Sequence, residues 1–208
     1  MKNIKFRNMA DHKTELDNHT GGLILMIIFT TVWTILSEIF FGNSDYRIVG
    51  IIFGLIILYL INAYIKFSNS KKLLTEIPVE NEPNNDKWFY TVVALEGVAI
   101  FVVQNILINI GKSNLAICSI ALIVGLHFIP LAKVFNRKFD YYIGIWTIAI
   151  AIIGIILITG NLYDYRMINA FVCLGCAIST TEYGLKKVRD GNLFLKKMES
   201  IINTAANK

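Results

Sequence analysis

Two side chains that can exchange protons lie at matching positions in long apolar segments of the sequence. Glu96 stands eight residues after the start of the segment Trp88–Ile110, and His127 stands eight residues before the end of Asn114–Phe135. If these segments are antiparallel helices, both residues lie about 12 Å from the same end, at 1.5 Å per residue. An ionisable group inside hydrocarbon is costly, so such positions are candidates for function. An acid and an imidazole at one depth stabilise one another and can bind and release a proton.

Pro130 lies in the same segment as His127. Proline has no N–H, so it leaves the carbonyl of Leu126 without its helical partner, one residue from the imidazole. A free carbonyl, a histidine and a carboxylate at one level are typical of a proton or cation site. The alternative is a buried pair that only locks the two helices together.

A second group of polar side chains lies nearer the other end of the helices. Glu38 shares one helical face with several hydroxyl residues, and Gln104 lies in the outer half of Trp88–Ile110. Glu38 and Gln104 are therefore a candidate outer binding site, although hydroxyls and amides also hold membrane helices together. Gly50 and Gly54 form a GxxxG pattern, which predicts close helix packing within the bundle or in a homo-oligomer.

The elements that must position these residues are six apolar segments, each long enough to cross a bilayer as a helix. They are Gly21–Phe41, Tyr46–Phe67, Trp88–Ile110, Asn114–Phe135, Asp140–Gly160 and Asp164–Leu185. Only 17% of the 208 residues are charged, and the charges stand between the apolar segments. We therefore expect an all-α polytopic membrane protein in which the six helices form three hairpins.

Lysine and arginine predict the orientation. Of the 20 basic residues, 17 fall in 1–20, 66–87, 133–138 and 186–208, which lie on one side of the predicted membrane. The positive-inside rule places these regions, and both termini, in the cytoplasm. The predicted location is the inner or plasma membrane of a cell. Because the basic residues are spread over short loops, nucleic-acid binding is not expected.

The predicted cytoplasmic parts are a polar segment (1–20), an irregular loop (Ser68–Lys87) and a basic tail (186–208). After Gly191-Asn192 the tail has apolar residues at helical spacing, which predicts a short amphipathic helix on the inner leaflet or against a neighbouring subunit. The basic residues expected to meet anionic inner-leaflet lipids are Lys186, Lys187, Arg189, Lys196 and Lys197.

Signals for other chemistry are weak. The three cysteines, Cys118, Cys173 and Cys176, lie inside apolar segments and are interpreted as small packing residues. The sequence predicts no metal site and no cofactor, and it has no P-loop, GxSxG or HExxH motif. Soluble-type enzyme chemistry is disfavoured; an acid–base enzyme within the membrane, using Glu96 and His127, is the weaker alternative.

The residues Gly125-Leu126-His127-Phe128-Ile129-Pro130-Leu131-Ala132-Lys133-Val134-Phe135, followed by Tyr141-Tyr142-Ile143-Gly144, resemble a motif of a family of small bacterial integral membrane proteins of unknown function. The resemblance implies that His127 and Pro130 belong to a family signature, and it implies no activity.

Two functions follow from these observations. The first is a small transporter or channel-like protein, in which Glu96 and His127 link protonation to the movement of a small solute or ion. The second is an accessory, sensor or defence protein that acts through its cytoplasmic loop and tail without transporting anything.

Overall fold

The computed structural model describes residues 2–42, 44–45, 47–72 and 86–206, and this part of the chain is helical without any strand. The elements are α1 (Lys2–Phe41), α2 (Ile48–Lys72), α3 (Asp86–Asn109), a short 3-10 turn η1 (Ser113–Leu115), α4 (Ala116–Val134), α5 (Lys138–Thr159) and α6 (Tyr165–Ala206). The predicted all-α class is confirmed. Most of the predicted irregular loop, residues 73–85, lies outside the described residues; the ends of that loop belong to α2 and α3.

Five helical segments are long and apolar enough to cross a membrane. They are His19–Phe41, Ile48–Lys71, Trp88–Asn109, Ser113–Val134 and Lys138–Thr159. These segments agree closely with the first five predicted spans, as expected for a protein that is solvated by lipid. The predicted sixth span, Asp164–Leu185, lies within α6, which is less apolar and is not among the five.

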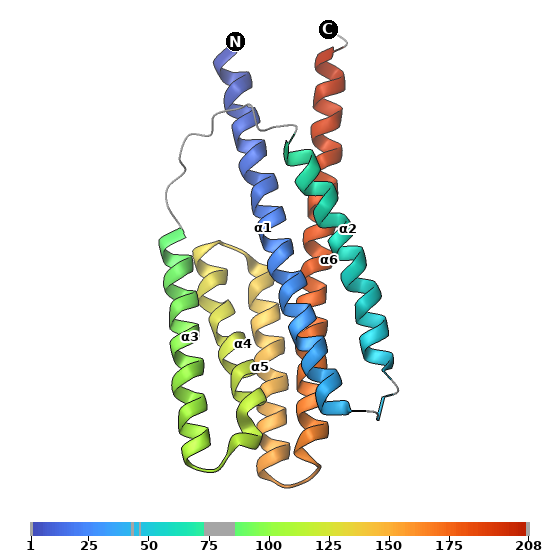
Figure 1. The fold of residues 1–208 in the computed structure, drawn as a ribbon. Helices are drawn as coiled ribbons and strands as arrows, with labels where there is room; N and C mark the ends of the chain where they lie inside the picture. The colour runs from blue at the N-terminus through green and yellow to red at the C-terminus, as the bar shows by residue number, and fades with distance from the viewer. Residues whose placement is uncertain (1, 43, 46, 73–85, 207–208) are drawn as a thin grey trace.

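The helices run alternately up and down, so that α1 begins and α6 ends at the same end of the molecule, here called the terminal end (Figure 1). α1 and α6 pack along one another in the middle, α2 flanks them on one side, and α5, α4 and α3 follow in order on the other. The most extensive contacts are α1 with α6 and α4 with α5. Both contacts join different predicted hairpins, so the three hairpins are not separate packing units.

Two glycines explain why α4 and α5 approach so closely. A Cβ atom on Gly125 would lie 2.9 Å from the backbone nitrogen of Ile148 and 3.1 Å from the carbonyl oxygen of Gly144. A Cβ on Gly144 would lie 2.9 Å from the Gly125 carbonyl oxygen. Small residues at a helix crossing let the backbones touch, which is the usual packing device between membrane helices.

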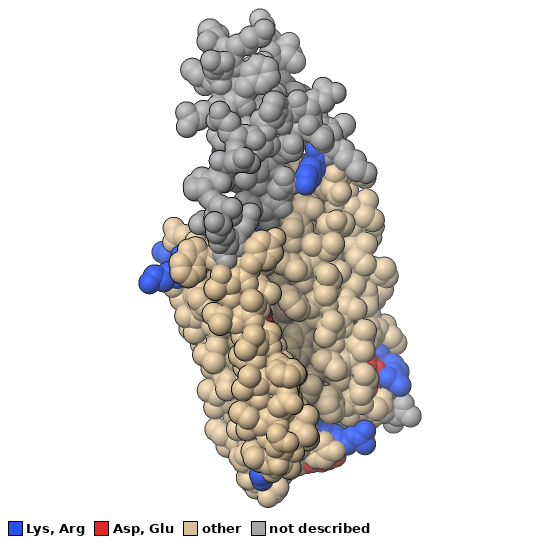
Figure 2. Space-filling model, turned by 60° about the vertical axis from the view of Figure 1, so that its left-hand side comes forward, with Lys and Arg blue, Asp and Glu red and all other residues tan. Residues whose placement is uncertain are grey.

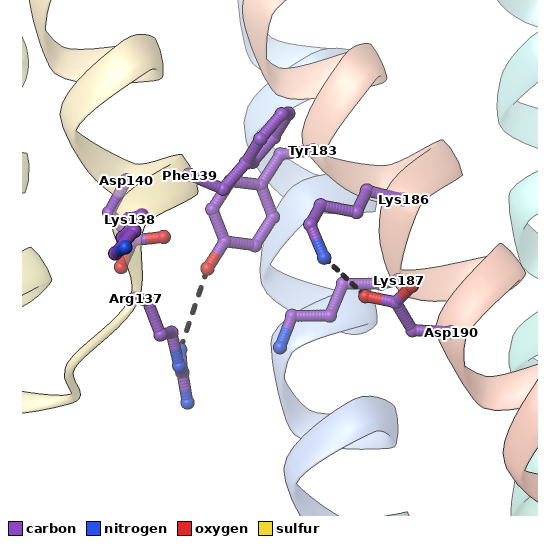
Figure 3. A pocket seen from close by; sticks show the side chains of 8 residues that line it. All are labelled: Arg137, Lys138, Phe139, Asp140, Tyr183, Lys186, Lys187 and Asp190. Atoms are coloured by element: carbon purple, nitrogen blue, oxygen red, sulfur yellow. Dashed lines mark hydrogen bonds and ion pairs between the residues drawn. The ribbon is translucent and has the colours of Figure 1, made fainter.

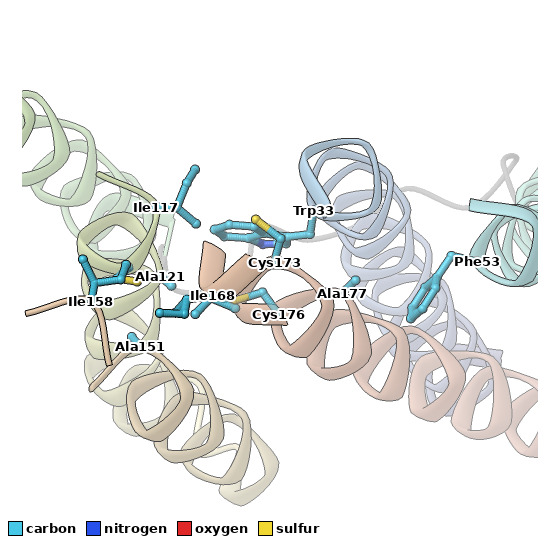
Figure 4. Close-up of a cluster of buried hydrophobic side chains, with 12 residues drawn as sticks. Trp33, Phe53, Ile117, Ala121, Ala151, Ile158, Ile168, Cys173, Cys176 and Ala177 are labelled. Atoms are coloured by element: carbon cyan, nitrogen blue, oxygen red, sulfur yellow. The ribbon is translucent and has the colours of Figure 1, made fainter. Parts of the chain in front are cut away.

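The main core joins side chains from every long helix except α3 (Figure 4). It contains Trp33, Phe53 and the three cysteines. The cysteines are buried and form no disulfide bond, which confirms that they are packing residues. Outside the core, large apolar side chains such as Leu55 and Phe101 remain exposed. In Figure 2 the charged residues of the visible face gather near its ends, and the surface between them is almost free of charge. An apolar exposed belt of this kind is suited to lipid.

Hydroxyl groups join α1 to α6 inside this bundle. Thr30 donates a hydrogen bond to Thr180 across 2.9 Å, and Ser37 donates to the carbonyl of Ala170 across 3.0 Å. These side chains belong to the polar face that the sequence shows on the first span. The structure therefore supports their role in holding helices together.

The predicted separate tail helix is wrong, because α6 continues without a break through Gly191 and Asn192 to Ala206. Leu195 and Met198 pack against a buried cluster at the terminal end rather than facing outward. That cluster comes from α1, α2 and α6 and comprises Leu16, Leu23, Leu60, Ala63, Phe67, Val188 and Phe194. The apolar stripe of the tail thus finds its partner within the chain. The N-terminal polar segment is likewise not separate from the first span, since both belong to α1.

Candidate functional site

The structure brings Glu96 and His127 together at the interface of α3 and α4. Glu96 Oε1 lies 3.3 Å from His127 Nδ1, and the side chains are only 13% and 11% exposed. Counting residues from the helix ends placed them at one depth, and the antiparallel packing of α3 on α4 makes them face each other. The meeting of acid and imidazole is therefore a feature of the fold as well as of the sequence.

The imidazole is held in a defined orientation. His127 Nδ1 lies 2.8 Å from the carbonyl oxygen of Val124, one turn earlier on α4, and the same nitrogen faces Glu96. A carbonyl can only accept a hydrogen bond, so Nδ1 keeps its hydrogen, and the pair gains or loses a proton at Nε2 of His127 or at the Glu96 carboxylate. Pro130 lies within α4, which continues past it to Val134.

This arrangement can hold a mobile proton. In surroundings of low dielectric constant, a net charge is more costly than a neutral pair. A carboxylate beside an imidazolium and a carboxylic acid beside a neutral imidazole are both neutral overall. The Glu96–His127 pair can therefore hold one proton, either on the Glu96 carboxylate or on Nε2 of His127, and it gains or loses net charge only when a proton or another cation enters or leaves.

A second polar contact attaches α3 to α4 nearer the opposite end. The amide nitrogen of Gln104 donates to Ser119 Oγ at 2.9 Å and to the carbonyl of Ala116 at 3.1 Å. Among the described residues, α3 contributes none of the buried hydrophobic side chains. The outermost helix is thus held to the bundle by partly buried contacts and by these two polar contacts along α4.

Glu38 has a different role from the one predicted. Its Oε1 accepts a hydrogen bond from the backbone N–H of Gly50 at 2.6 Å, and its Oε2 forms an ion pair with Arg47 at 3.1 Å. A carboxylate at the start of a helix satisfies backbone N–H groups that have no other partner. Glu38 therefore caps α2. The predicted outer site combining Glu38 with Gln104 is wrong, because the two side chains have separate partners in different parts of the bundle.

The GxxxG pattern is used only in part. A Cβ on Gly50 would lie 3.0 Å from the Glu38 carboxylate, so this glycine admits the capping side chain. A Cβ on Gly54 would meet nothing within 4 Å. Gly54 is thus not a close helix contact within this chain, and its role in an oligomer stays a prediction.

The sequence reasoning missed a pocket of about 330 Å³ at the terminal end (Figure 3). It lies where α5 begins and α6 passes, and it is lined by Arg137, Lys138, Phe139, Asp140, Tyr183, Lys186, Lys187 and Asp190. Burial, followed by the nearby positive charge of Arg137, lowers the pKa of Lys187 to about 8. The available signal was the spacing of Tyr183 and Lys187, which lie four residues apart and so share one helical face.

No group of three or more His, Cys, Asp or Glu side chains that could hold a metal ion occurs in the part of the chain that the structure describes. No protein-family model, curated protein or solved structure matches the chain.

Proposed function

We propose that this chain is a six-span integral membrane protein with both termini in the cytoplasm, and that its Glu96–His127 pair links protonation to the movement of a small solute or ion. The membrane is the inner or plasma membrane of a bacterial cell, in keeping with the resemblance of Gly125–Phe135 to a bacterial family signature. The proposed class is a small transporter or channel-like protein.

The assignment of α6 as the sixth span rests on its surroundings. Its first half packs against α1, α4 and α5, and it contributes buried residues such as Asn169 and Thr180. The side chains of a helix that is shielded from lipid by its neighbours can be less apolar than those of a helix at the lipid-facing surface. The orientation rests on the 17 of 20 basic residues that fall in the terminal regions and in the two loops at that end.

The contact between Glu96 and His127 is the observation that carries the proposed function. Ionisable groups in membrane-spanning segments are costly, and they mark proton relays and ion pathways. This pair joins α4 to the most peripheral helix, so a change in its net charge acts directly on how α3 is held. A site of this kind can couple proton binding to a change in access.

Proton movement into vesicles tests the proposal. The purified protein is reconstituted into liposomes containing a pH-sensitive dye, and a potassium diffusion potential drives protons inward. We expect flux through the natural protein, loss of flux in Glu96→Gln and in His127→Ala, and unchanged flux in Glu182→Gln, a matched change at an exposed acid of α6.

Thermal unfolding of each variant separates a functional pair from a structural one. If Glu96→Gln and His127→Ala unfold at the same temperature as the natural protein but carry no protons, the pair is functional. Equal flux in all variants, or no flux in the natural protein, contradicts the proposal.

A second candidate function, an accessory or sensor protein, is favoured by the length of α1 and α6. Helices of 40 and 42 residues extend for about 60 Å at 1.5 Å per residue, twice the thickness of a hydrocarbon core of about 30 Å. Together with the end of α2 they form the buried terminal cluster. Under this proposal the terminal end projects into the cytoplasm, where exposed Arg189, Lys196 and Lys197 face anionic lipids or a partner.

Site-specific photo-crosslinking distinguishes this second candidate. A photoreactive residue at Leu193, which is 58% exposed on the terminal part of α6, is compared with one at Leu95, which is 64% exposed on α3. A discrete protein adduct at Leu193 in native membranes, absent at Leu95, supports a cytoplasmic partner. Lipid adducts alone at both positions contradict it.

A further inference from the structure

The pocket at the start of α5 has more positive than negative charge. Its lining includes four cationic side chains but only two carboxylates, those of Asp140 and Asp190. Asp190 is already engaged, because the Lys186 ammonium donates to it one turn away on α6 (Figure 3). The other carboxylate, Asp140, remains for the two cations Arg137 and Lys187.

Asp140 interacts electrostatically with both cations, but one carboxylate can offset only one of two positive charges. Its Oδ1 is buried without a hydrogen-bond partner, and the neighbouring Tyr183 hydroxyl accepts a hydrogen bond from Arg137 Nη1 at 3.5 Å. Among the described residues, no carboxylate forms an ion pair with Arg137 or Lys187. One acid beside two cations leaves net positive charge facing the cavity.

The Lys187 ammonium packs against two parts of the protein. It lies 5.7 Å from the centre of the Tyr183 ring, and α1 makes room for it with Gly22. A Cβ on Gly22 would lie 2.9 Å from Lys187 Cε and 3.3 Å from Nζ. A lysine that is folded back into the protein, rather than extended into solvent, loses hydration and gains from a bound anion.

The beginning of α5 adds to the attraction for an anion. Arg137 is the N-cap of this 22-residue helix and makes no side-chain capping hydrogen bond, and Asp140 is the acidic residue of the first turn. The free N–H groups and the dipole of a helix N-terminus favour phosphate and related groups. Cations from two helices and this helix start converge on a space of about 330 Å³.

From this geometry we infer that the pocket binds a phosphate group, with Arg137 and Lys187 as its principal ligands. The pocket opens where the span Lys138–Thr159 begins, at the level of the lipid headgroups if the proposed membrane placement holds. The phosphate is therefore that of an anionic phospholipid. A soluble phosphate compound has the same chemistry and is distinguished by experiment. Only the source of the phosphate rests on the proposed topology, and nothing in the inference depends on Glu96 or His127.

Native mass spectrometry of the purified protein in detergent tests the inference. Phosphatidylglycerol is titrated against the natural protein and two variants, Lys187→Met and Arg137→Gln. Arg166→Gln is the matched control, since it removes the same charge from an exposed position at the beginning of α6, far along the helix from the pocket. Phosphatidylcholine, whose headgroup has no net charge, is the lipid control.

We expect one molecule of phosphatidylglycerol to be retained by the natural protein and by Arg166→Gln with similar affinity. In Lys187→Met and in Arg137→Gln the affinity should fall about tenfold or more, as is usual when one charged hydrogen-bonding partner is removed. Circular dichroism of each variant without lipid checks folding. The two variants alter different segments of the chain. If one of them fails to fold, the other still tests the inference.

Inorganic phosphate provides the second arm. If millimolar phosphate raises the unfolding temperature of the natural protein but not of Lys187→Met, and phosphatidylglycerol is not retained, the site binds soluble phosphate compounds. Equal retention of both lipids, or an equal loss of binding in Arg166→Gln, overturns the inference. Glu96→Gln should retain phosphatidylglycerol normally, so failure of the proton-flux experiment does not affect this result.

Discussion

The replacement of Gly191 by alanine tests whether α6 is one continuous helix that packs on α2. A Cβ at this position would lie 2.6 Å from Phe67 Cζ and 2.7 Å from Cε2, and Phe67 is completely buried. In an open helical position, alanine is more favourable than glycine by about 1 kcal/mol. Overpacking a core side chain costs about 1–3 kcal/mol. We therefore expect Gly191→Ala to lower the free energy of unfolding by up to about 2 kcal/mol.

Removing the aromatic ring should reverse the sign of this effect. Phe67→Ala alone costs about 3–5 kcal/mol, because it empties a buried site. In that background the added methyl group of Gly191→Ala has space, so it should stabilise the protein by up to about 1 kcal/mol. The coupling between the two positions is then about 1–3 kcal/mol, as expected for residues in direct contact.

Thermal unfolding in detergent measures both effects, since 1 kcal/mol corresponds to about 2–4 °C in a protein of this size. Gly21→Ala is the matched control, because a Cβ on this glycine of α1 would meet nothing within 4 Å. It should raise the unfolding temperature slightly. If Gly191→Ala raises the temperature as Gly21→Ala does, Phe67 does not pack there, and a helix break at Gly191-Asn192 becomes the better description.

Three further predictions concern other contacts. Glu38→Gln should lower the unfolding temperature by about 2–4 °C, because the charge-assisted bond to the Gly50 N–H is lost; no change would show that the cap is unimportant. Burial lowers the pKa of Lys187 to about 8, so between pH 8 and 10.5 the unfolded chain binds more protons than the folded protein. The free energy of unfolding should therefore increase as the pH rises through this range. Lys187→Met should remove this pH dependence in unfolding experiments. Gly125→Ala should destabilise the protein by about 1–3 kcal/mol in the same assay, because the backbone of Ile148 cannot move aside as a side chain can. A neutral result would argue against the close α4–α5 crossing.

The sequence predicted those features that depend on local composition. The first five spans follow from the length of apolar residues that a bilayer requires, and their bounds agree with the structure to within a few residues. The meeting of Glu96 with His127 also followed, because antiparallel neighbours of equal length bring matching depths together. In both cases the period and rise of the helix were enough.

The predictions failed where the outcome depends on a distant partner. Gly191 resembles a helix end, but it lies inside α6 because the Phe67 ring occupies the space beside it. Glu38 resembles a binding residue, but a turn of six residues brings the start of α2 to its carboxylate. The pocket around Lys187 requires α5, α6 and Gly22 of α1 at once. No pattern within a single segment contains that information.

The distribution of polar contacts within the bundle bears on how it can move. α1 and α6 are joined by buried hydroxyl bonds such as Thr30 to Thr180, and α4 and α5 by touching glycine backbones. Displacing either interface would break many packed contacts together. α3 has no buried hydrophobic side chain among the described residues, and it packs chiefly on α4. Its displacement therefore costs the least, and the Glu96–His127 pair lies in its interface. A proton that alters this pair acts on the one helix that can respond without disrupting the core, which is where a proton-linked change in access requires it to be.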